Sequence, residues 1–169
     1  MKIIVAAAAA ALVLGAASAA TAADRHSGVY GTLGYQDSEG LAVVQARLGY
    51  RFEKYVGLEL EGGLGVKDDT VQVSGVNVKL KEENQSAGYV VGFLPVSDKL
   101  DLFVRGGYGR AHLKASVPGF SASAGANDWA YGAGGQYLFD GKNGVRVEYT
   151  KFSSGDYSNS WSVAYVRQF

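Results

Sequence analysis

Residues 56–66 read V-G-L-E-L-E-G-G-L-G-V, and this stretch decides the fold. Its even-numbered positions are apolar or glycine, with Leu58 and Leu60 in the row, whereas its odd-numbered positions hold only glycine and the carboxylates Glu59 and Glu61. Successive side chains of a β-strand point to opposite faces, so the pattern predicts a strand with one apolar and one charged face. Alternation alone fits both a soluble β-sandwich with the leucines inside and a membrane barrel with the leucines in lipid.

The N-terminus has the layout of an exported protein. Lys2 precedes an apolar run from Ile3 to Leu14, and a series of small residues follows. This arrangement predicts a cleaved secretory signal peptide over residues 1–23 and a mature domain over residues 24–169. The alternative, a transmembrane anchor, is disfavoured because the apolar run is shorter than the roughly 20 residues that a spanning helix needs.

Composition narrows the class of protein further. The chain of 169 residues has 24 Gly and 11 Tyr but no Cys, so an exported domain of this sequence is not held together by disulfides. The formal net charge is zero, which disfavours a nucleic-acid binder that relies on a general positive field. The pattern of Cys and His indicates no zinc site, and no cofactor is predicted.

Alternating segments divide the mature chain into an even number of expected strands, which is typical of a closed up-and-down barrel. The connections alternate between short turns, at 53–55, 95–99 and 140–144, and long excursions, over 67–84 and 109–127. We therefore predict an all-β fold, an eight-stranded antiparallel up-and-down transmembrane β-barrel. The expected strands are 28–36, 41–52, 56–73, 76–94, 100–117, 120–139, 145–152 and 159–169.

Each expected strand has one face suited to lipid and one suited to a polar lumen. Aromatic residues on the apolar face cluster at both strand ends, as two membrane interfaces favour. The predicted lipid-facing residues include Val44, Ala46, Leu48, Tyr50, Phe52, Ala87, Tyr89, Val91, Phe93, Trp129, Tyr131, Ala133, Tyr137, Phe139, Trp161, Val163 and Tyr165. The predicted lumen charges are Arg47, Arg51, Glu59, Glu61, Asp101, Arg105, Arg146 and Glu148.

The apolar pattern changes face beyond Val66. A two-residue turn at Ser74-Gly75 would pair Leu58 with Val91 and Leu60 with Tyr89. A turn at Pro118-Gly119 would likewise place Tyr108 opposite Trp129. Beyond the membrane level the apolar residues then point inward, so we predict two hairpins that project into water. The inward residues are Val71, Val73, Val76, Val78, Leu80, Leu113, Val117 and Phe120.

Three segments, 49–61, 93–109 and 129–139, resemble the small outer-membrane β-barrel proteins of Gram-negative bacteria, of OmpA and OmpX type. They read G-Y-R-F-E-K-Y-V-G-L-E-L-E, F-L-P-V-S-D-K-L-D-L-F-V-R-G-G-Y-G and W-A-Y-G-A-G-G-Q-Y-L-F. The resemblance covers essentially the whole mature chain and implies the outer membrane as location, with periplasmic short turns and extracellular hairpins. It also implies that the barrel-assembly machinery reads the terminal strand. The residues that would carry this signal are Trp161, Val163, Tyr165 and Phe169, with Arg167 as a departure from the pattern.

The balanced lumen charges have two interpretations. An eight-stranded barrel is just wide enough to be filled by its side chains, so the charges form a salt-bridged plug in the first interpretation. In the second, shifting ion pairs line the path of a small porin-like channel.

The projecting hairpins are the predicted contact surface. One basic set on their outward face fits the phosphates of lipopolysaccharide, although ordinary solvated charge explains it as well. The inward apolar strip either packs over the barrel mouth or docks an extracellular protein partner. The basic set is Lys79, Lys81, Arg110, His112 and Lys114.

We predict a structural, surface-exposed outer-membrane protein rather than an enzyme. The porin-like channel is the first alternative. A lipid A-modifying enzyme, with His112 beside Ser116 or Ser123, is the second, and it lacks a nearby acidic residue to orient the histidine.

Overall fold

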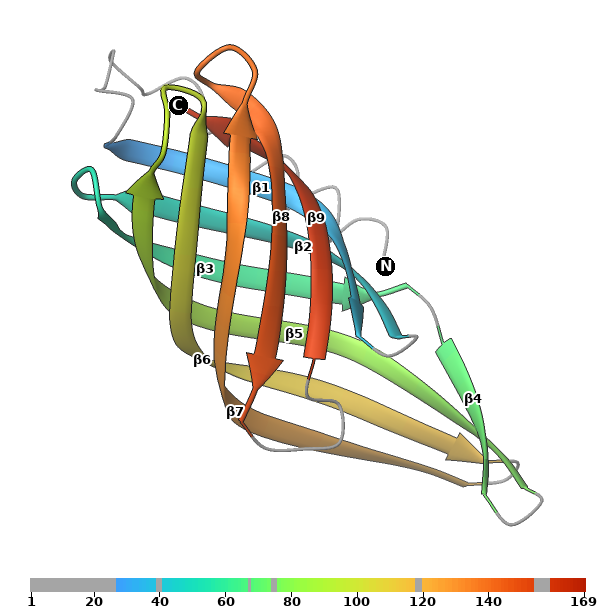
Figure 1. The fold of residues 1–169 in the computed structure, drawn as a ribbon. Coiled ribbons are helices and arrows are strands. Elements are labelled where there is room, and N and C mark those ends of the chain that lie inside the picture. Colours follow the sequence, from blue (N-terminus) through green and yellow to red (C-terminus); the bar gives the residue numbers. More distant parts are fainter. Residues whose placement is uncertain (1–26, 39–40, 67, 74–75, 118–119, 154–158) are drawn as a thin grey trace.

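A computed structural model describes residues 27–38, 41–66, 68–73, 76–117, 120–153 and 159–169. Its strands form one antiparallel sheet in the order β3-β2-β1-β9-β8-β7-β6-β5-β4, and an additional β3–β5 pairing closes it (Figure 1). The strands are β1 (Gly28–Ser38), β2 (Leu41–Arg51), β3 (Val56–Gly65), β4 (Asp68–Val73), β5 (Val76–Pro95), β6 (Leu100–Val117), β7 (Phe120–Leu138), β8 (Asn143–Phe152) and β9 (Asn159–Gln168).

The closed barrel has the eight antiparallel strands that the sequence predicts, because β4 lies outside the closure and pairs with β5. The expected strand 56–73 is divided into β3 and β4. The predicted signal peptide, 1–23, lies outside the described residues and stays a prediction. Among the residues that the structure describes, no helix is long and apolar enough to cross a membrane.

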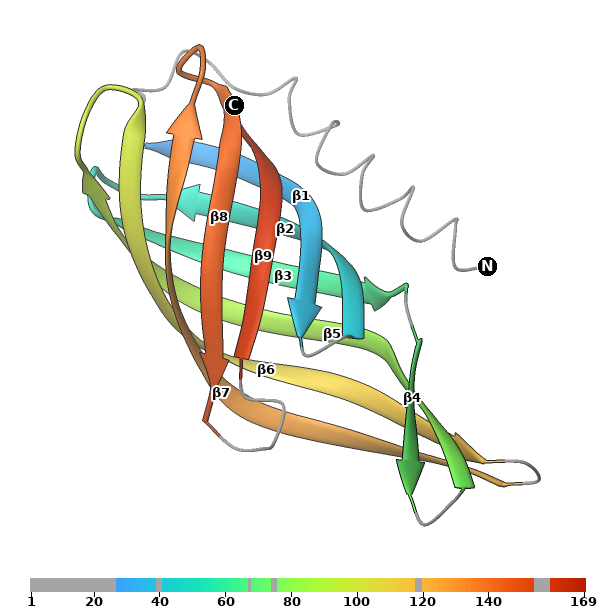
Figure 2. The same cartoon turned by 45° about the vertical axis from the view of Figure 1, so that its right-hand side comes forward.

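Strands β5, β6 and β7 have 20, 18 and 19 residues, whereas the other five barrel strands have 10 or 11. Their far ends run past the barrel wall together with β4 as two hairpins (Figures 1 and 2). Tyr108 lies opposite Trp129, as the predicted turn requires. The side chains of residues 68–83 and 111–124 are not described, so the packing of the inward apolar strip stays a prediction.

The faces of β5 within the barrel are opposite to the prediction. Leu58 pairs with Val90 and not with Val91, and Leu60 pairs with Gly88 and not with Tyr89. A shift of one residue moves every side chain of a strand to the other face. The assignment of Ala87, Tyr89, Val91 and Phe93 to lipid is therefore wrong, because this face of β5 lines the lumen. Tyr89 is 3% exposed, Val91 0% and Phe93 5%.

Two irregularities at one level explain this error. Between the pairs Leu64–Asn84 and Asp68–Lys81, the β3–β4 side contains one residue more than β5. At the same level the β5–β6 register shifts between Glu82 and Asn84. A β-bulge resets the face of a strand, so a register deduced from the turn holds for β4 but not for β3.

The outward face of the barrel is an apolar belt, as predicted for the leucines of β3. Leu58 and Leu60 are 47% and 69% exposed, whereas Glu59 between them is 1% exposed. The two predicted aromatic levels are also present on this face. Phe93 is not part of them, because its ring points into the lumen. Their exposed members are Tyr35, Tyr108, Trp129 and Trp161 at the hairpin end and Tyr50, Phe52, Tyr137 and Phe139 at the short-turn end.

Local hydrogen bonds close the short turn between β7 and β8. The carboxylate of Asp140 accepts hydrogen bonds from the backbone nitrogens of Lys142, at 2.9 Å, and Asn143, at 2.6 Å. The Asn143 side-chain amide adds a third at 2.7 Å. These donors favour the charged form and lower the pKa of Asp140 to about 2.

Candidate functional site

The candidate site is the charged lumen. The eight lumen charges predicted from the sequence are all buried there, each at most 7% exposed. They come in pairs from four strands, because every second residue of a strand points inward. Arg47 and Arg51 lie on β2, Glu59 and Glu61 on β3, Asp101 and Arg105 on β6, and Arg146 and Glu148 on β8.

Two arginines join the carboxylates at the centre. Arg146 lies between Glu59, at 2.5 Å from Nη1 to Oε1, and Glu148, at 3.0 Å from Nη2 to Oε2. Arg105 lies between Glu61, at 2.9 Å from Nη1 to Oε2, and Glu148, at 2.5 Å from Nη2 to Oε1. Each guanidinium thus bridges carboxylates of two strands, which ties β3 to β8 across the lumen.

Arg47 completes a neutral network of three arginines and three glutamates, which we call the central network (Arg47, Arg105, Arg146, Glu59, Glu61 and Glu148). Its Nε lies 2.7 Å from Glu61 Oε2, and its Nη2 lies 3.2 Å from Glu148 Oε1. Tyr30 donates a hydrogen bond of 2.7 Å to Glu59 Oε1. Because buried charges are costly without partners, this pairing is what allows six ionised groups inside the barrel.

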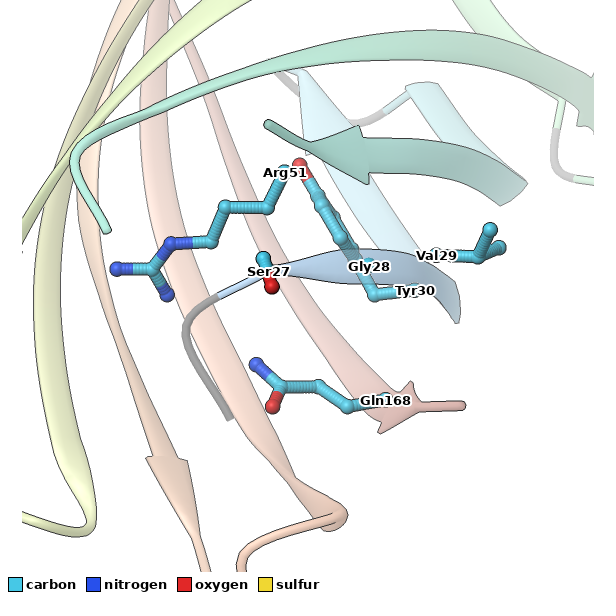
Figure 3. A pocket seen from close by; sticks show the side chains of 6 residues that line it. All are labelled: Ser27, Gly28, Val29, Tyr30, Arg51 and Gln168. Atoms are coloured by element: carbon cyan, nitrogen blue, oxygen red, sulfur yellow. The ribbon is translucent and has the colours of Figure 1, made fainter. Parts of the chain in front are cut away.

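Arg51 and Asp101 form a separate pair toward the short turns. Arg51 Nη1 lies 3.1 Å from Asp101 Oδ2, and Arg51 Nε donates to the backbone oxygen of Lys54 at 3.0 Å. Gln136 donates a further hydrogen bond of 3.0 Å to Asp101. Arg51 also borders a small pocket at this end of the barrel (Figure 3). The pocket is lined by Ser27, Gly28, Val29, Tyr30, Arg51 and Gln168.

Aromatic rings support three of the arginines, and the sequence analysis missed this role. The guanidinium carbon of Arg51 lies 4.1 Å from the centroid of the Phe93 ring. The guanidinium carbon of Arg105 lies 3.9 Å from that of the Tyr89 ring, and the guanidinium carbon of Arg146 lies 3.8 Å from that of the Phe103 ring. Phe103 alternates with Asp101 and Arg105 on β6, so the sequence does indicate that its ring points into the lumen. The rings of Tyr89 and Phe93 could not be placed in this way, because the register of β5 differs by one residue from the predicted one.

Glycine makes room for these rings on the neighbouring strand. Phe103 lies directly opposite Gly134, and Tyr89 lies directly opposite Gly107. A Cβ on Gly134 would lie 2.2 Å from the Val147 backbone oxygen and 2.6 Å from the Phe103 ring. Gly134 therefore lets the Phe103 ring lie close against the backbone of β7, and Arg146 packs on that ring.

Replacing Gly134 by Ala is expected to destabilise the folded barrel by about 1–3 kcal/mol, the range for forcing extra atoms into a packed core. Urea unfolding of the protein in lipid vesicles measures the effect. Gly135→Ala is the matched control, since the nearest neighbour of its Cβ would be Leu102 Cδ2 at 3.5 Å, an ordinary contact. Equal stability of the two variants would contradict the close-packing argument.

Several buried polar atoms near the ion pairs have no hydrogen-bond partner among the described residues. Both amide atoms of Gln45 are in this state on the hairpin side of Arg47. The hydroxyl of Thr32, which lies directly opposite Arg47 on β1, is in the same state. Toward the short turns, one oxygen each of Asp101 and Gln136 also lacks a donor. Buried polar atoms of this kind are commonly satisfied by internal water. The lumen can thus hold water on both sides of the central network.

The predicted basic set is only partly described. Arg110 is exposed on β6. In the register, Lys81 lies opposite Lys114, Lys79 opposite Ser116 and His112 opposite Asn84. The side chains of Lys79, Lys81, His112 and Lys114 lie outside the described residues, as do those of Ser116 and Ser123. Within the described part of the chain, no group of three or more His, Cys, Asp or Glu residues is arranged to hold a metal ion.

The predicted assembly signal lies on the outward face of β9. Trp161 is 62% exposed, Val163 54% and Tyr165 46%. Phe169 follows the strand, and its backbone nitrogen donates to the Val29 oxygen at 3.0 Å. The carboxyl end of the chain is thereby attached to β1 at the seam where the first and last strands meet.

Comparison with known proteins agrees with this geometry. The family model described as the outer membrane protein β-barrel domain matches residues 6–169. No protein with a curated description matches the sequence.

Solved structures share the fold at low sequence identity. The N-terminal β-barrel domain of Pseudomonas aeruginosa OprF superposes with a TM-score of 0.64 at 12% identity, over 83% of this chain and 96% of that one. Ail, the attachment invasion locus protein of Yersinia pestis, gives 0.55 at 17% identity, over 83% and 95%. Neisserial surface protein A gives 0.56 at 9% identity, over 83% and 94%. Ail has also been solved with the heparin analogue sucrose octasulfate.

Proposed function

Because this chain belongs to the family of outer membrane protein β-barrel domains, we propose that it is a structural, surface-exposed protein of the Gram-negative outer membrane with a plugged lumen. The central network carries this proposal. It links β2, β3, β6 and β8 through buried ion pairs, so the charges cross-link the barrel wall from inside. The aromatic levels on the outward face provide the anchoring at the two membrane interfaces.

In the proposed orientation the two hairpins project from the cell surface, and the short turns and both chain ends face the periplasm. The cleaved signal peptide, 1–23, serves export, and the exposed face of β9 from Trp161 to Phe169 is the segment for the barrel-assembly machinery to recognise. Arg167 is compatible with this role, because its guanidinium lies 5.8 Å from the Phe169 ring at the membrane edge. An arginine in that position can extend its charge to the interface.

The projecting hairpins, 67–84 and 109–127, are the proposed contact surface for lipopolysaccharide or an extracellular protein. Their register supports this, because it places two lysines, Lys81 and Lys114, opposite each other. Like charges opposite each other destabilise a strand pair, so a bound anion would relieve their repulsion. The fold likeness to Ail, which binds a polyanionic heparin analogue, is consistent with an anionic partner.

Purified protein in planar lipid bilayers is expected to show no steady single-channel steps, because an eight-stranded barrel is narrow enough for its own side chains to fill it and the paired charges of the central network are buried inside. Conductance recording across the physiological voltage range measures this. Refolding is checked first by heat-modifiable mobility on a gel, so that an empty trace from unfolded protein is not counted. Reproducible steps of one size would overturn the plug and establish the porin-like alternative, which the unpartnered polar atoms on both sides of the network favour.

A further inference from the structure

Charged residues are rare on the outward face of the barrel and follow a rule. Among the described outward-facing side chains of the strands they are Asp37, Arg110, Lys151 and Arg167. Each follows an aromatic residue by two positions on the same strand face, in the direction away from the barrel centre. The aromatic partners are Tyr35, Tyr108, Tyr149 and Tyr165 in the same order. The charges therefore mark the outer limits of the apolar belt.

Two of these cations flank one exposed tryptophan. Trp129 is 64% exposed on β7 and lies directly opposite Tyr108 on β6, so Arg110 is its diagonal neighbour on that side. On the other side, Ser153 donates a backbone hydrogen bond of 2.9 Å to the Trp129 oxygen, which makes Lys151 the diagonal neighbour on β8. Diagonal neighbours lie about 7–8 Å apart, within reach of long side chains.

Further aromatic residues surround Lys151. Tyr131, 50% exposed, lies directly opposite it on β7. Trp161, 62% exposed, is diagonal to it on β9 and packs against Tyr149, with ring centroids 4.7 Å apart and ring planes tilted by 55°. The one acidic residue of the outward set at this end, Asp37, lies on β1, on the far side of Trp161. Lys151 and Arg110 are both exposed.

We propose that Arg110, Trp129 and Lys151 form a binding site for the phosphate groups of an anionic glycolipid in the outer leaflet. The two cations take the phosphates, and the exposed indole lies against the apolar and sugar parts of the lipid. A lipid is the fitting source of the phosphate, because the site opens onto the apolar belt and not onto the lumen. The inference rests on the proposed function only in requiring that the hairpin end of the barrel faces the outside of the cell. Lys151 lies on β8, outside both proposed contact hairpins, so the two proposals can be tested separately.

The test uses the full mature protein in vesicles, with bisphosphorylated lipid A as the probe. The chain has two tryptophans, Trp129 and Trp161, and both border Lys151, so intrinsic tryptophan fluorescence reports on the site itself. Lys151→Gln is expected to weaken lipid A binding about fivefold, which corresponds to roughly 1 kcal/mol for one cation near an anionic lipid surface. The double variant with Arg110→Gln is expected to weaken binding further.

Three comparisons make the test selective. Lys142→Gln, the same change in an exposed short turn, is expected to bind lipid A like the wild type. Dephosphorylated lipid A is expected to bind more weakly, and free inorganic phosphate is expected not to compete. Wild-type affinity in Lys151→Gln, or an equal loss in Lys142→Gln, would overturn the proposal, as would equal binding of the dephosphorylated lipid or competition by inorganic phosphate.

The proposed function can fail separately. Conductance steps would refute the plug without changing lipid A binding. A variant with Gln at Lys79, Lys81 and Lys114 tests the hairpins alone, and unchanged affinity there together with a loss in Lys151→Gln would assign lipid binding to the barrel wall. Heat-modifiable mobility of every variant shows that it has folded before its binding is measured.

Discussion

Glu59→Gln is expected to lower the free energy of unfolding by about 3–5 kcal/mol, the usual cost of removing one partner from a buried ion pair. Glu59 accepts Arg146 at 2.5 Å and the Tyr30 hydroxyl at 2.7 Å, and it is 1% exposed. The glutamine keeps the shape but leaves the buried central network with one positive charge that has no carboxylate to balance it. Urea unfolding in vesicles, followed by circular dichroism, measures the loss.

Glu53→Gln is the matched control for this prediction, since Glu53 is exposed in the short turn between β2 and β3. The same charge change there is expected to stay within about 0.5 kcal/mol of the wild type, as surface substitutions usually do. Adding Arg146→Met to Glu59→Gln is expected to recover part of the stability, because an apolar residue removes the uncompensated charge. A Glu59→Gln protein as stable as Glu53→Gln would show that the central network does not support the fold.

Leu60→Arg is expected to destabilise the barrel by about 2–4 kcal/mol in a lipid bilayer, the cost of an arginine on the lipid face near the midplane. Leu60 is the most exposed of the large apolar residues that the structure describes, at 69%. On a water-facing surface the same change would be nearly neutral. Urea unfolding in vesicles of lipids with a defined acyl-chain length measures this loss of stability. The same loss is expected in bilayers of longer acyl chains.

Val66→Arg is the depth control for Leu60→Arg. Val66 is 57% exposed and follows the last residue of β3, at the level where the strand leaves the barrel. The penalty near an interface is about 0–1 kcal/mol, so this variant is expected to be close to the wild type. Equal penalties at Leu60 and Val66 would contradict the assignment of the belt to lipid.

The barrel and most of its two faces could be predicted from the sequence because they depend on local alternation. The row around Leu58 and Glu59 needs no partner to show which residues share a face. The lumen charges on β2, β3, β6 and β8 follow from the same rule, and the structure brings all eight into the barrel interior. Which arginine meets which carboxylate could not be deduced, since those pairs join residues as far apart as Arg47 and Glu148.

β5 shows why the register required the tertiary structure. The turn after Val73 correctly predicted the pairing of β4 with β5, and the same rule failed for β3. One additional residue between β3 and β4 changes no apolar pattern noticeably, yet it turns Tyr89, Val91 and Phe93 into the lumen. Sequence alternation alone therefore places the rings that support Arg51 and Arg105 in lipid, which is wrong. A bulge is a non-local choice, decided by what packs on both sides of the sheet.

The sequence by itself determined the number of barrel strands, the long hairpins and the division of residues 56–66 into a leucine face and a glutamate face. These features depend on the period of a strand, which every residue reports locally. Only the tertiary structure decided the face of β5, the stacking of arginines on aromatic rings and the position of Lys151 between two tryptophans. Those features depend on register across the closed sheet, and a shift of one residue that the sequence hardly marks is enough to reverse them.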